Sequence, residues 1–539
     1  MGFKEEIIKI LKKEVGDVEL EVPQDKKFGD YSLPCFVLSK KFKKNPNEIA
    51  KELEKRLKNK LNVKAVGPYL NFFEDDVTNV LKNILKNKNY GSVNLGKKKK
   101  ILIEHTSINP NASPHVGRAR NALIGDSLVR ILKFVNYKPE VHYFVNDVGK
   151  QIAMLVLGCR KTSGITFEKL LKIYVKINEQ ADELQDEIFD LLYKLENGDK
   201  DVRREFRDVV NICLKGQAKI LGKLGIKYDY YDFESKYLWD KETENILKKL
   251  EKTGKLFIDE EKRNVLDLKD FKLAMRIPVF VLTRGDGTSL YGLRDIAYTI
   301  DKLKRAKDNI LVLGEDQKLY FEQLKAALSL LGEDFPKVVH YSFVLLTEGK
   351  MSTRKGNVVL LEEFMDEIEK KAKLELKKRS RKVNDRLVKE IGYGSLKYSI
   401  LKVSPEKNVL FDLDSALNFE GNSGAYCQYA HARAHSILKR GGAGKIDLKL
   451  LKHQKEIELI KWLGKFPEVV EKSAIELKPN LLANYSYEVA KCFNEFYSEV
   501  RVLCEDKEAS KARVALVKGV TIVLKNSLNL LGIEAPEVM

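Results

Sequence analysis

The sequence predicts an α/β protein organised around a parallel sheet, and three observations support this prediction. Apolar strands alternate with helical periodicity from Ile101 onward, short apolar strands resume near Ile277, and the pattern beyond about residue 366 is helical to the end. At 539 residues the chain has room for several domains, each with a core of its own.

The first 95 residues are expected to form a small, separate α/β domain. Ile7 and Leu11 lie on one face of an N-terminal helix, and a second amphipathic helix follows Asn45-Pro46. Residues 63–73 have the pattern of extended backbone. The lysine run at 97–100 is either the linker out of this domain or a solvated charge run.

The segment from Ile101 to Val135 has the pattern strand, polar loop, helix. His115 and Gly117 stand where the loop meets the helix. Helix N-termini present free N–H groups and the positive end of the helix dipole, so this junction suits a phosphate. Taken alone, the stretch is equally consistent with an ordinary strand-to-helix turn.

Further apolar runs end in polar residues, as expected of strands that build a site together. Residues 141–145 are the second strand, and the runs 277–282, 309–313 and 338–346 are expected to join the same sheet. Ligands of such sheets bind at the carboxyl ends of the strands. Residues 166–275 are charged and helical, which predicts an insertion between two halves of the sheet domain.

Composition narrows the functional class. A formal net charge of +19 favours a polyanionic partner, nucleic acid first, although an evenly solvated lysine-rich surface is the alternative. Six scattered cysteines without a Cys-x-x-Cys pair argue against structural zinc and against a disulfide framework, and they fit a reducing cytosol. No apolar run is long enough to span a bilayer, and a secretory signal is not apparent.

Five motifs occur in an order that resembles the arginyl-tRNA synthetases, a family of class I aminoacyl-tRNA synthetases, in its archaeal or thermophilic form. They are Glu104-His-Thr-Ser-Ile-Asn109 with Pro114-His-Val-Gly117, Phe144-Val-Asn-Asp-Val-Gly-Lys-Gln151, Asp286-Gly-Thr-Ser-Leu-Tyr291 with Arg294-Asp295, Met351-Ser-Thr-Arg-Lys-Gly356, and the segment Gly421 to Arg433. A lone His-x-Gly turn is a weak signal, but this ordered set covers essentially the whole chain.

The resemblance implies an arginine–tRNA ligase, which joins L-arginine to tRNA(Arg) through an arginyl-adenylate formed from ATP. It implies a Rossmann-like parallel-sheet catalytic domain (96–165 and 276–365) split by a helical insertion (166–275), with a small N-terminal α/β tRNA-binding domain (1–95). A stem-contact region (366–415) and an all-α anticodon-binding domain (416–539) would follow. ATP with Mg²⁺ would be the cofactors, without structural zinc, in a cytoplasmic monomer.

The resemblance places the ATP-binding residues on two loops: Pro114, His115, Gly117, Met351, Ser352, Thr353 and Lys355. The catalytic residues would be His115, Lys350, Lys355 and Arg118, which stabilise the charge spreading over the phosphates. Arg118 stands where the family usually has a second histidine, and Thr353 where it has a lysine. We hypothesise that Arg118 takes the role of that histidine, because a guanidinium also binds phosphate oxygens.

Five residues are expected to bind arginine: Glu104, Asn109, Tyr291, Asp295 and Gln317. A guanidinium is best held by carboxylates, and Asp295 is the first choice, with Tyr291 one helical turn before it. Asn109 and Gln317 would contact the backbone end of the amino acid. The simpler alternative for Asp295 is a surface ion pair with Arg294 or Lys302.

The helical C-terminal region is expected to contact tRNA, because aromatic rings stack on unpaired bases and basic side chains bind phosphates. The residues expected to do so are Tyr426, Gln428, Tyr429, His431 and Arg433, although about half of such aromatics are core residues of helices.

Two alternatives remain open from the sequence. One is another ATP-cleaving enzyme of the same fold, either a different class I synthetase or a small-molecule nucleotidyltransferase, the latter leaving the basic helical C-terminus unexplained. The other is a tRNA-binding relative without catalysis, for which Arg118 and Thr353 are the only hints.

Overall fold

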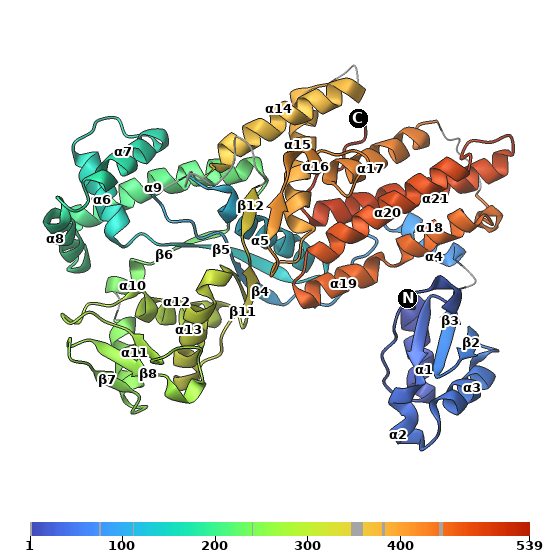
Figure 1. The fold of residues 1–539 in the computed structure, drawn as a ribbon, viewed down its shortest axis with the longest axis horizontal. Coiled ribbons are helices and arrows are strands. Elements are labelled where there is room, and N and C mark those ends of the chain that lie inside the picture. Colours follow the sequence, from blue (N-terminus) through green and yellow to red (C-terminus); the bar gives the residue numbers. More distant parts are fainter. Residues whose placement is uncertain are drawn as a thin grey trace. The chain divides into compact units, whose positions relative to one another are not determined.

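The computed structural model describes residues 3–74, 77–111, 113–239, 241–346, 359–379, 383–440 and 446–539 (Figure 1). The chain forms two compact units. The first comprises residues 1–90, 437–466 and 491–523, and the second comprises residues 91–436, 467–490 and 524–539. The helices expected as one C-terminal domain are therefore divided between the two units.

In the first unit, an antiparallel sheet of order β1-β3-β2 packs against helices. Helix α1 buries Ile7 and Leu11, as predicted. Helix α3 begins after Asn45, whose side chain accepts a hydrogen bond from the Asn47 N–H at 2.9 Å. The elements of this unit are α1 (Phe3–Glu14), η1 (Lys26–Phe28), β1 (Tyr31–Pro34), η2 (Cys35–Leu38), α2 (Ser39–Phe42), α3 (Pro46–Leu57), β2 (Asn62–Val66), β3 (Tyr69–Phe73), α4 (Thr78–Lys86), η6 (Leu448–Leu450) and α18 (Gln454–Gly464).

The second unit contains the predicted parallel sheet, with five strands in the order β11-β10-β4-β5-β6. The strands are β4 (Lys100–Glu104), β5 (Lys138–Val145), β6 (Tyr230–Phe233), β10 (Asp308–Gly314) and β11 (Lys337–Tyr341). Successive strands run outward from β4 on one side and from β10 on the other, so the strand order reverses between these two. The carboxyl ends of β4 and β10 therefore border the crevice in which open α/β sheets bind ligands.

Helices follow the strands of this sheet. The predicted helix after the first strand is α5 (Val116–Phe134), and its apolar face is buried. Helix α6 (Lys150–Arg160) follows β5, and η4 (Glu315–Gln317) with α13 (Lys318–Leu330) follows β10. The sheet is thus doubly wound, and the expected fold class is confirmed.

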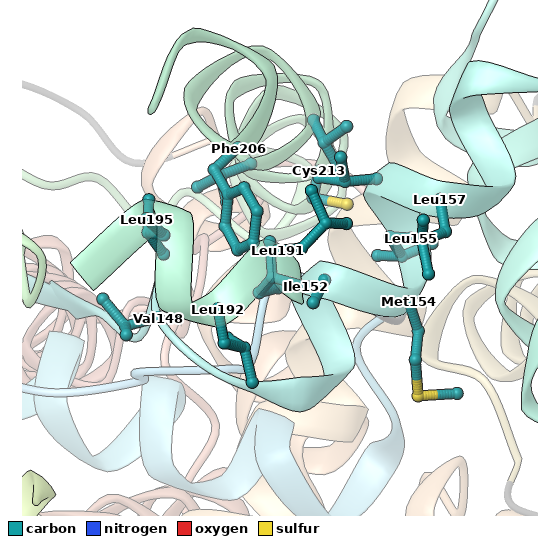
Figure 2. Close-up of a cluster of buried hydrophobic side chains, with 14 of the residues drawn as sticks. Val148, Ile152, Met154, Leu155, Leu157, Leu191, Leu192, Leu195, Phe206 and Cys213 are labelled. Carbon is teal, nitrogen blue, oxygen red and sulfur yellow. The ribbon is translucent and has the colours of Figure 1, made fainter. Parts of the chain in front are cut away.

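The insertion between β5 and β6 is helical, but its expected end at residue 275 needs correction. Helices α7 (Phe167–Glu179), α8 (Gln185–Glu196) and α9 (Lys200–Lys223) pack with α6 around a hydrophobic core (Figure 2). Phe206 and Cys213 of α9 lie in that core, together with Leu191 of α8. The chain then returns to the parallel sheet as β6, a strand of four residues that is too short to show a clear alternating pattern.

A small antiparallel sheet follows, and it corrects a second expectation. The run 277–282, expected in the parallel sheet, forms β9 (Val279–Val281), which pairs with β8 (Asn264–Asp267) and not with the five parallel strands. An apolar run cannot by itself show which sheet it joins. The neighbouring elements are α10 (Lys236–Trp239), α11 (Glu242–Glu251), β7 (Leu256–Ile258), η3 (Lys269–Phe271) and α12 (Tyr291–Arg305).

The run 338–346 is divided between β11 and β12 (Val344–Leu346), which pairs with β13 (Val409–Phe411). Beyond it the chain is mainly helical, as predicted, through α14 (Leu361–Arg379), α15 (Asp385–Leu401), α16 (Leu413–Ala416), α17 (Gly424–Leu438), α19 (Phe466–Glu476), α20 (Asn480–Glu499) and α21 (Lys507–Leu530). Within the described part of the chain, none of the helices has the length and apolarity needed to cross a bilayer.

Candidate active site

The loop between β4 and α5 leaves the sheet in a strained conformation. Thr106 has a φ of +81° and Ser107 a φ of +42°. Positive φ values are uncommon outside glycine, and for a β-branched residue such a backbone costs on the order of 1–3 kcal/mol. Thr106 is buried, so the surrounding structure must hold it in place.

His115 is the N-cap of α5, as its position in the sequence indicated. Its Nδ1 accepts a long hydrogen bond of 3.4 Å from the Arg118 N–H. Burial lowers the pKa of His115, and the charge of Arg118 lowers it further, so the ring is neutral at pH 7. With Nδ1 as the acceptor, Nε2 carries the proton and can donate it to a ligand oxygen.

The segment beyond the downstream motif is bonded beside His115. Val116 donates its N–H to the Val359 carbonyl at 3.3 Å, and Leu361 donates to the Pro114 carbonyl at 2.8 Å. Gly117 is one residue further along α5. The motif residues themselves lie outside the described residues, and they are Lys350, Met351, Ser352, Thr353 and Lys355.

Arg118 occupies the first turn of α5 with an exposed side chain. It is therefore free of the core and stands beside the helix N-terminus, where an anion is favoured.

Asp295 and Tyr291 share one face of α12, as their spacing predicted. Tyr320 of α13 connects them, because its hydroxyl donates to the Asp295 carboxylate and its ring lies 5.2 Å from that of Tyr291. Tyr291 is 56% exposed, so it stands at the opening of this group. Burial, together with the smaller effect of the Glu104 charge, raises the pKa of Asp295 to about 6, against the opposing hydrogen bond from Tyr320 and the opposing charges of Arg294 and Lys302.

The two cations expected as alternative partners of Asp295 pair with other acids. Lys302 forms a buried ion pair with Glu104, and the Arg294 Nε donates to Glu234 Oε1 at 2.6 Å. Glu104 is thus already neutralised from within the protein. Asp295 is left with a neutral hydroxyl as its hydrogen-bond partner.

Three residues of this group escaped the sequence reasoning: Tyr320, Glu234 and Asp147. Glu234 follows β6, is 1% exposed, and has a pKa raised by burial and by Asp295 against the opposing effect of Arg294. Asp147 follows β5 and accepts from Ser235, with 2.8 Å to the backbone N–H and 2.6 Å to the hydroxyl. For the two acids, the signal that could have been used is a carboxylate just beyond a strand end, after β5 for Asp147 and after β6 for Glu234. For Glu234 this signal depends on recognising β6 as a strand.

Asn109 and Gln317 are exposed on the loops after β4 and β10, the two strands that border the crevice. The Asn109 amide donates to Gln151 Oε1 at 3.3 Å, and the Gln317 amide donates to Asp316 Oδ2 at 3.0 Å. Both are weakly held and can exchange these partners for a ligand.

Two of the five residues expected to contact tRNA are internal. Gln428 is fully buried and donates to the Glu390 and Glu534 carbonyls at 2.9 and 2.8 Å. His431 is 1% exposed, with Nδ1 at 2.8 Å from the Pro536 carbonyl oxygen. Both hold the chain end against α17, so the expectation that they contact RNA is wrong.

The other three residues on α17 are half-buried and remain accessible: Tyr426, Tyr429 and Arg433. The Arg433 guanidinium lies 4.8 Å from the centre of the Tyr429 ring, which is a cation–π contact on the same helix. Among the residues that the structure describes, no group of three or more His, Cys, Asp or Glu side chains could hold a metal ion.

A doubly wound sheet with a His-x-Gly turn at the first helix fits a class I aminoacyl-tRNA synthetase, and similarity to known families shows that class. Residues 80–413 match the family model described as "tRNA synthetases class I (R), catalytic domain". Residues 2–73 match "Arginyl tRNA synthetase N terminal domain", and residues 427–539 match "DALR anticodon binding domain". The chain belongs to the arginyl-tRNA synthetase family.

Curated relatives that match nearly the whole chain are named as members of the same family. The "Arginine--tRNA ligase" of Methanocaldococcus jannaschii is 40% identical over 99% of this chain and 98% of its own. That of Methanothermobacter thermautotrophicus is 38% identical over 97% and 95%. Among solved structures, the Thermus thermophilus arginyl-tRNA synthetase covers 99% of both chains with a TM-score of 0.86 at 29% identity.

Proposed function

We propose that the crevice binds L-arginine beside ATP and forms arginyl-adenylate, from which arginine passes to tRNA. The overall reaction is ATP-dependent attachment of arginine to its tRNA, the activity of the family to which the chain belongs. The observation that carries the assignment of the amino-acid site is the carboxylate of Asp295, which has the Tyr320 hydroxyl as its partner while nearby Lys302 and Arg294 pair with other acids.

Arginine would be recognised through its charge and its planar fork of donors. The Asp295 carboxylate can accept two parallel hydrogen bonds from a guanidinium, a geometry that lysine cannot reproduce. Glu234, paired with Arg294, would support the pocket beside Asp295, and Tyr291 supplies an aromatic face at the opening. Asn109 and Gln317 would hold the amino and carboxylate groups. Glu104, neutralised by Lys302, would support the pocket from behind.

ATP would lie across the N-terminus of α5. The Nε2–H of neutral His115 would donate to a phosphate oxygen, and Pro114 and Gly117 would leave space for the nucleotide. The arginine carboxylate attacks the α-phosphorus, a new P–O bond forms, and the bond to pyrophosphate breaks. Arg118, Lys350 and Lys355 would stabilise the developing charge, with Met351, Ser352 and Thr353 lining the nucleotide. Mg²⁺ would enter with the ATP phosphates, its usual ligands.

Contact with tRNA would fall to the flanking regions. We assign residues 1–95 and 416–539 to tRNA binding, residues 366–415 to the stem contact, and residues 96–365 to catalysis with the insertion inside them. The match of residues 427–539 to an anticodon-binding model supports the assignment of the C-terminal region. On α17, Tyr426, Tyr429 and Arg433 are the accessible residues for the RNA. The protein would act as a cytoplasmic monomer.

The test is Asp295→Asn, which keeps size and removes charge. With labelled arginine and total tRNA, the variant should lose at least about a hundredfold in kcat/KM for arginine, since a charged hydrogen-bonded pair is lost. The matched control is Asp301→Asn on the same helix, where the carboxylate pairs with Lys236 and Arg305 at 2.9 and 3.0 Å. Unchanged kcat/KM for arginine in Asp295→Asn would refute the assignment.

A further inference from the structure

The strained turn between Glu104 and His115 is held by side chains from other elements. The Thr106 N–H donates to Asn121 Oδ1 at 2.6 Å, and the Asn121 amide donates to the Val312 carbonyl of β10 at 2.8 Å. The Tyr228 hydroxyl donates to Thr106 Oγ1 at 2.7 Å. These contacts fix the first half of the turn against α5, β10 and the approach to β6.

The second half of the turn is bonded to a buried residue of the helical insertion. Gln217 of α9 is fully buried, and its amide donates to the Asn109 carbonyl at 3.0 Å. Its Oε1 lies 2.9 Å from the Tyr143 hydroxyl. That hydroxyl accepts from the Ile108 N–H at 3.0 Å and lies 2.9 Å from the Ile108 carbonyl oxygen. Gln217 and Tyr143 thus bond the backbone of Ile108 and Asn109 from the protein interior.

Unlike ordinary core packing, these hydrogen bonds restrain the backbone of a residue whose side chain is exposed. The Asn109 side chain is exposed and is held by Gln151 over 3.3 Å, so its position depends on its backbone. The backbone is in turn held by two side chains whose own positions are set by burial, at 0% and 1% exposure. A side chain that must meet a small ligand needs such a rigid support, because small displacements weaken binding strongly.

We propose that Gln217 and Tyr143 are positioning residues, which hold the Ile108–Asn109 backbone so that Asn109 meets the arginine substrate. This rests on the proposed function, in which Asn109 binds the backbone end of arginine. The helical insertion then contributes to arginine affinity through one buried amide of α9. Neither residue touches the substrate.

The experiment compares Gln217→Leu, Tyr143→Phe and the double variant in ATP–pyrophosphate exchange with tRNA at saturation. Each single variant should raise the KM for arginine about tenfold, the effect of one or two lost neutral hydrogen bonds, with the KM for ATP within about twofold. The double variant should raise it by less than the product of the two, because both residues act through one turn.

The matched control is Val202→Ala, about four turns earlier on α9 and buried in the insertion core. It loosens the same helix without reaching the turn, so it should lower the melting temperature and leave the KM for arginine unchanged. If both single variants keep the wild-type KM for arginine, or if they raise the KM values for arginine and ATP together, the positioning role is refuted. If Asp295→Asn also leaves arginine use intact, the arginine site itself is wrong. If Asp295→Asn loses arginine use while the Gln217 and Tyr143 variants keep it, only the positioning role is refuted.

Discussion

Lys302 and Arg294 determine how much negative charge the crevice offers to a ligand. Each is buried beside one acid, Glu104 and Glu234 respectively, and breaking such a pair by removing one partner typically costs about 3–5 kcal/mol. Asp295 has a hydroxyl partner and a pKa raised to about 6, so its charge is available but sensitive to pH. Arginine binding should therefore depend on the ionisation of this carboxyl group.

The pH dependence follows from the sign of that shift. The pKa of Asp295 lies above its ordinary value of 3.8, at about 6, so the free protein carries the charge above pH 6 and loses it below. The guanidinium stays positive throughout, so kcat/KM for arginine should be constant above about pH 7 and fall about tenfold per pH unit well below 6. A profile measured between about pH 5 and 8 tests this, with kcat/KM for ATP followed in parallel. A wild-type profile that stays flat to about pH 5 would contradict it.

Arg118 can be tested against the histidine that the family usually has there. Its exposed side chain stands beside the N-terminus of α5, so Arg118→Ala should slow adenylate formation about tenfold or more through the loss of a charged phosphate contact. Arg118→His should retain most of the rate. Single-turnover formation of arginyl-adenylate measures both. Arg130→Ala is the control, since Arg130 lies on the same helix and pairs with Asp126 at 2.7 Å. A large gain with Arg118→His would mean that Arg118 is a handicap.

At the scale of elements, the packing of α5 against the end of β4 explains why residue 125 is a glycine. A Cβ at Gly125 would overlap the ring of His105, which is 1% exposed and whose pKa burial lowers to about 3. The helix can therefore approach the strand end closely only with glycine at this position. His105 begins the strained loop, so this packing also sets where the loop starts.

Gly125→Ala should destabilise the protein by about 1–3 kcal/mol, the usual effect of overpacking. The matched control is Gly222→Ala on α9, where nothing lies within 4 Å of the new Cβ. There alanine should stabilise by about 0.5–1 kcal/mol through helix propensity. Urea unfolding of the two variants beside the wild type measures both. Equal effects of the same sign would show that the His105 contact does not matter.

The elements also show what could be predicted from the sequence. Helix α5 carried a strong periodicity, and α3 had an Asn-Pro start signal, so both were predicted. Strand β6 could not be predicted, because its four partly exposed residues are too few to show an alternating pattern and only their pairing with β5 defines the strand. For the same reason β9 was placed in the wrong sheet, since pairing partners are not encoded in an apolar run.

The residues of the candidate site likewise fall into those that a local pattern could place and those that it could not. Asp295 and Tyr291 could be placed together because helical spacing is local. The pairing of Glu104 with Lys302, and the presence of Glu234 and Tyr320, depend on contacts between segments far apart in the chain, which no local pattern contains. Gln428 and His431 were misjudged because a polar helix face can bond buried backbone carbonyls as readily as it can face solvent.

At the scale of the whole molecule, the net charge of +19 predicts salt-dependent tRNA binding. Because each neutralised phosphate releases counterions, the KM for tRNA should rise at least about tenfold between about 50 and 200 mM salt. The KM for arginine, measured at saturating tRNA, should change by less than about twofold over that range. Steady-state aminoacylation at several salt concentrations gives both values. A KM for tRNA independent of salt would show that the excess charge is spread evenly over the surface.

Helix α9 leads out of the insertion core straight into β6, and this limits how the insertion can be exchanged between relatives. A chimera cut at the start of β6 would replace the helix that carries Gln217 while keeping Ile108 and Asn109. A cut beyond Ser235 would replace β6, the edge strand that pairs with β5. It would also replace Ser235, the hydrogen-bond partner of Asp147. Functional transplantation of this insertion should therefore require residues 143–235, which include the partners Tyr143 and Asp147, and the β4–α5 loop to travel together. The insertion behaves as part of the catalytic scaffold and not as an independent cassette.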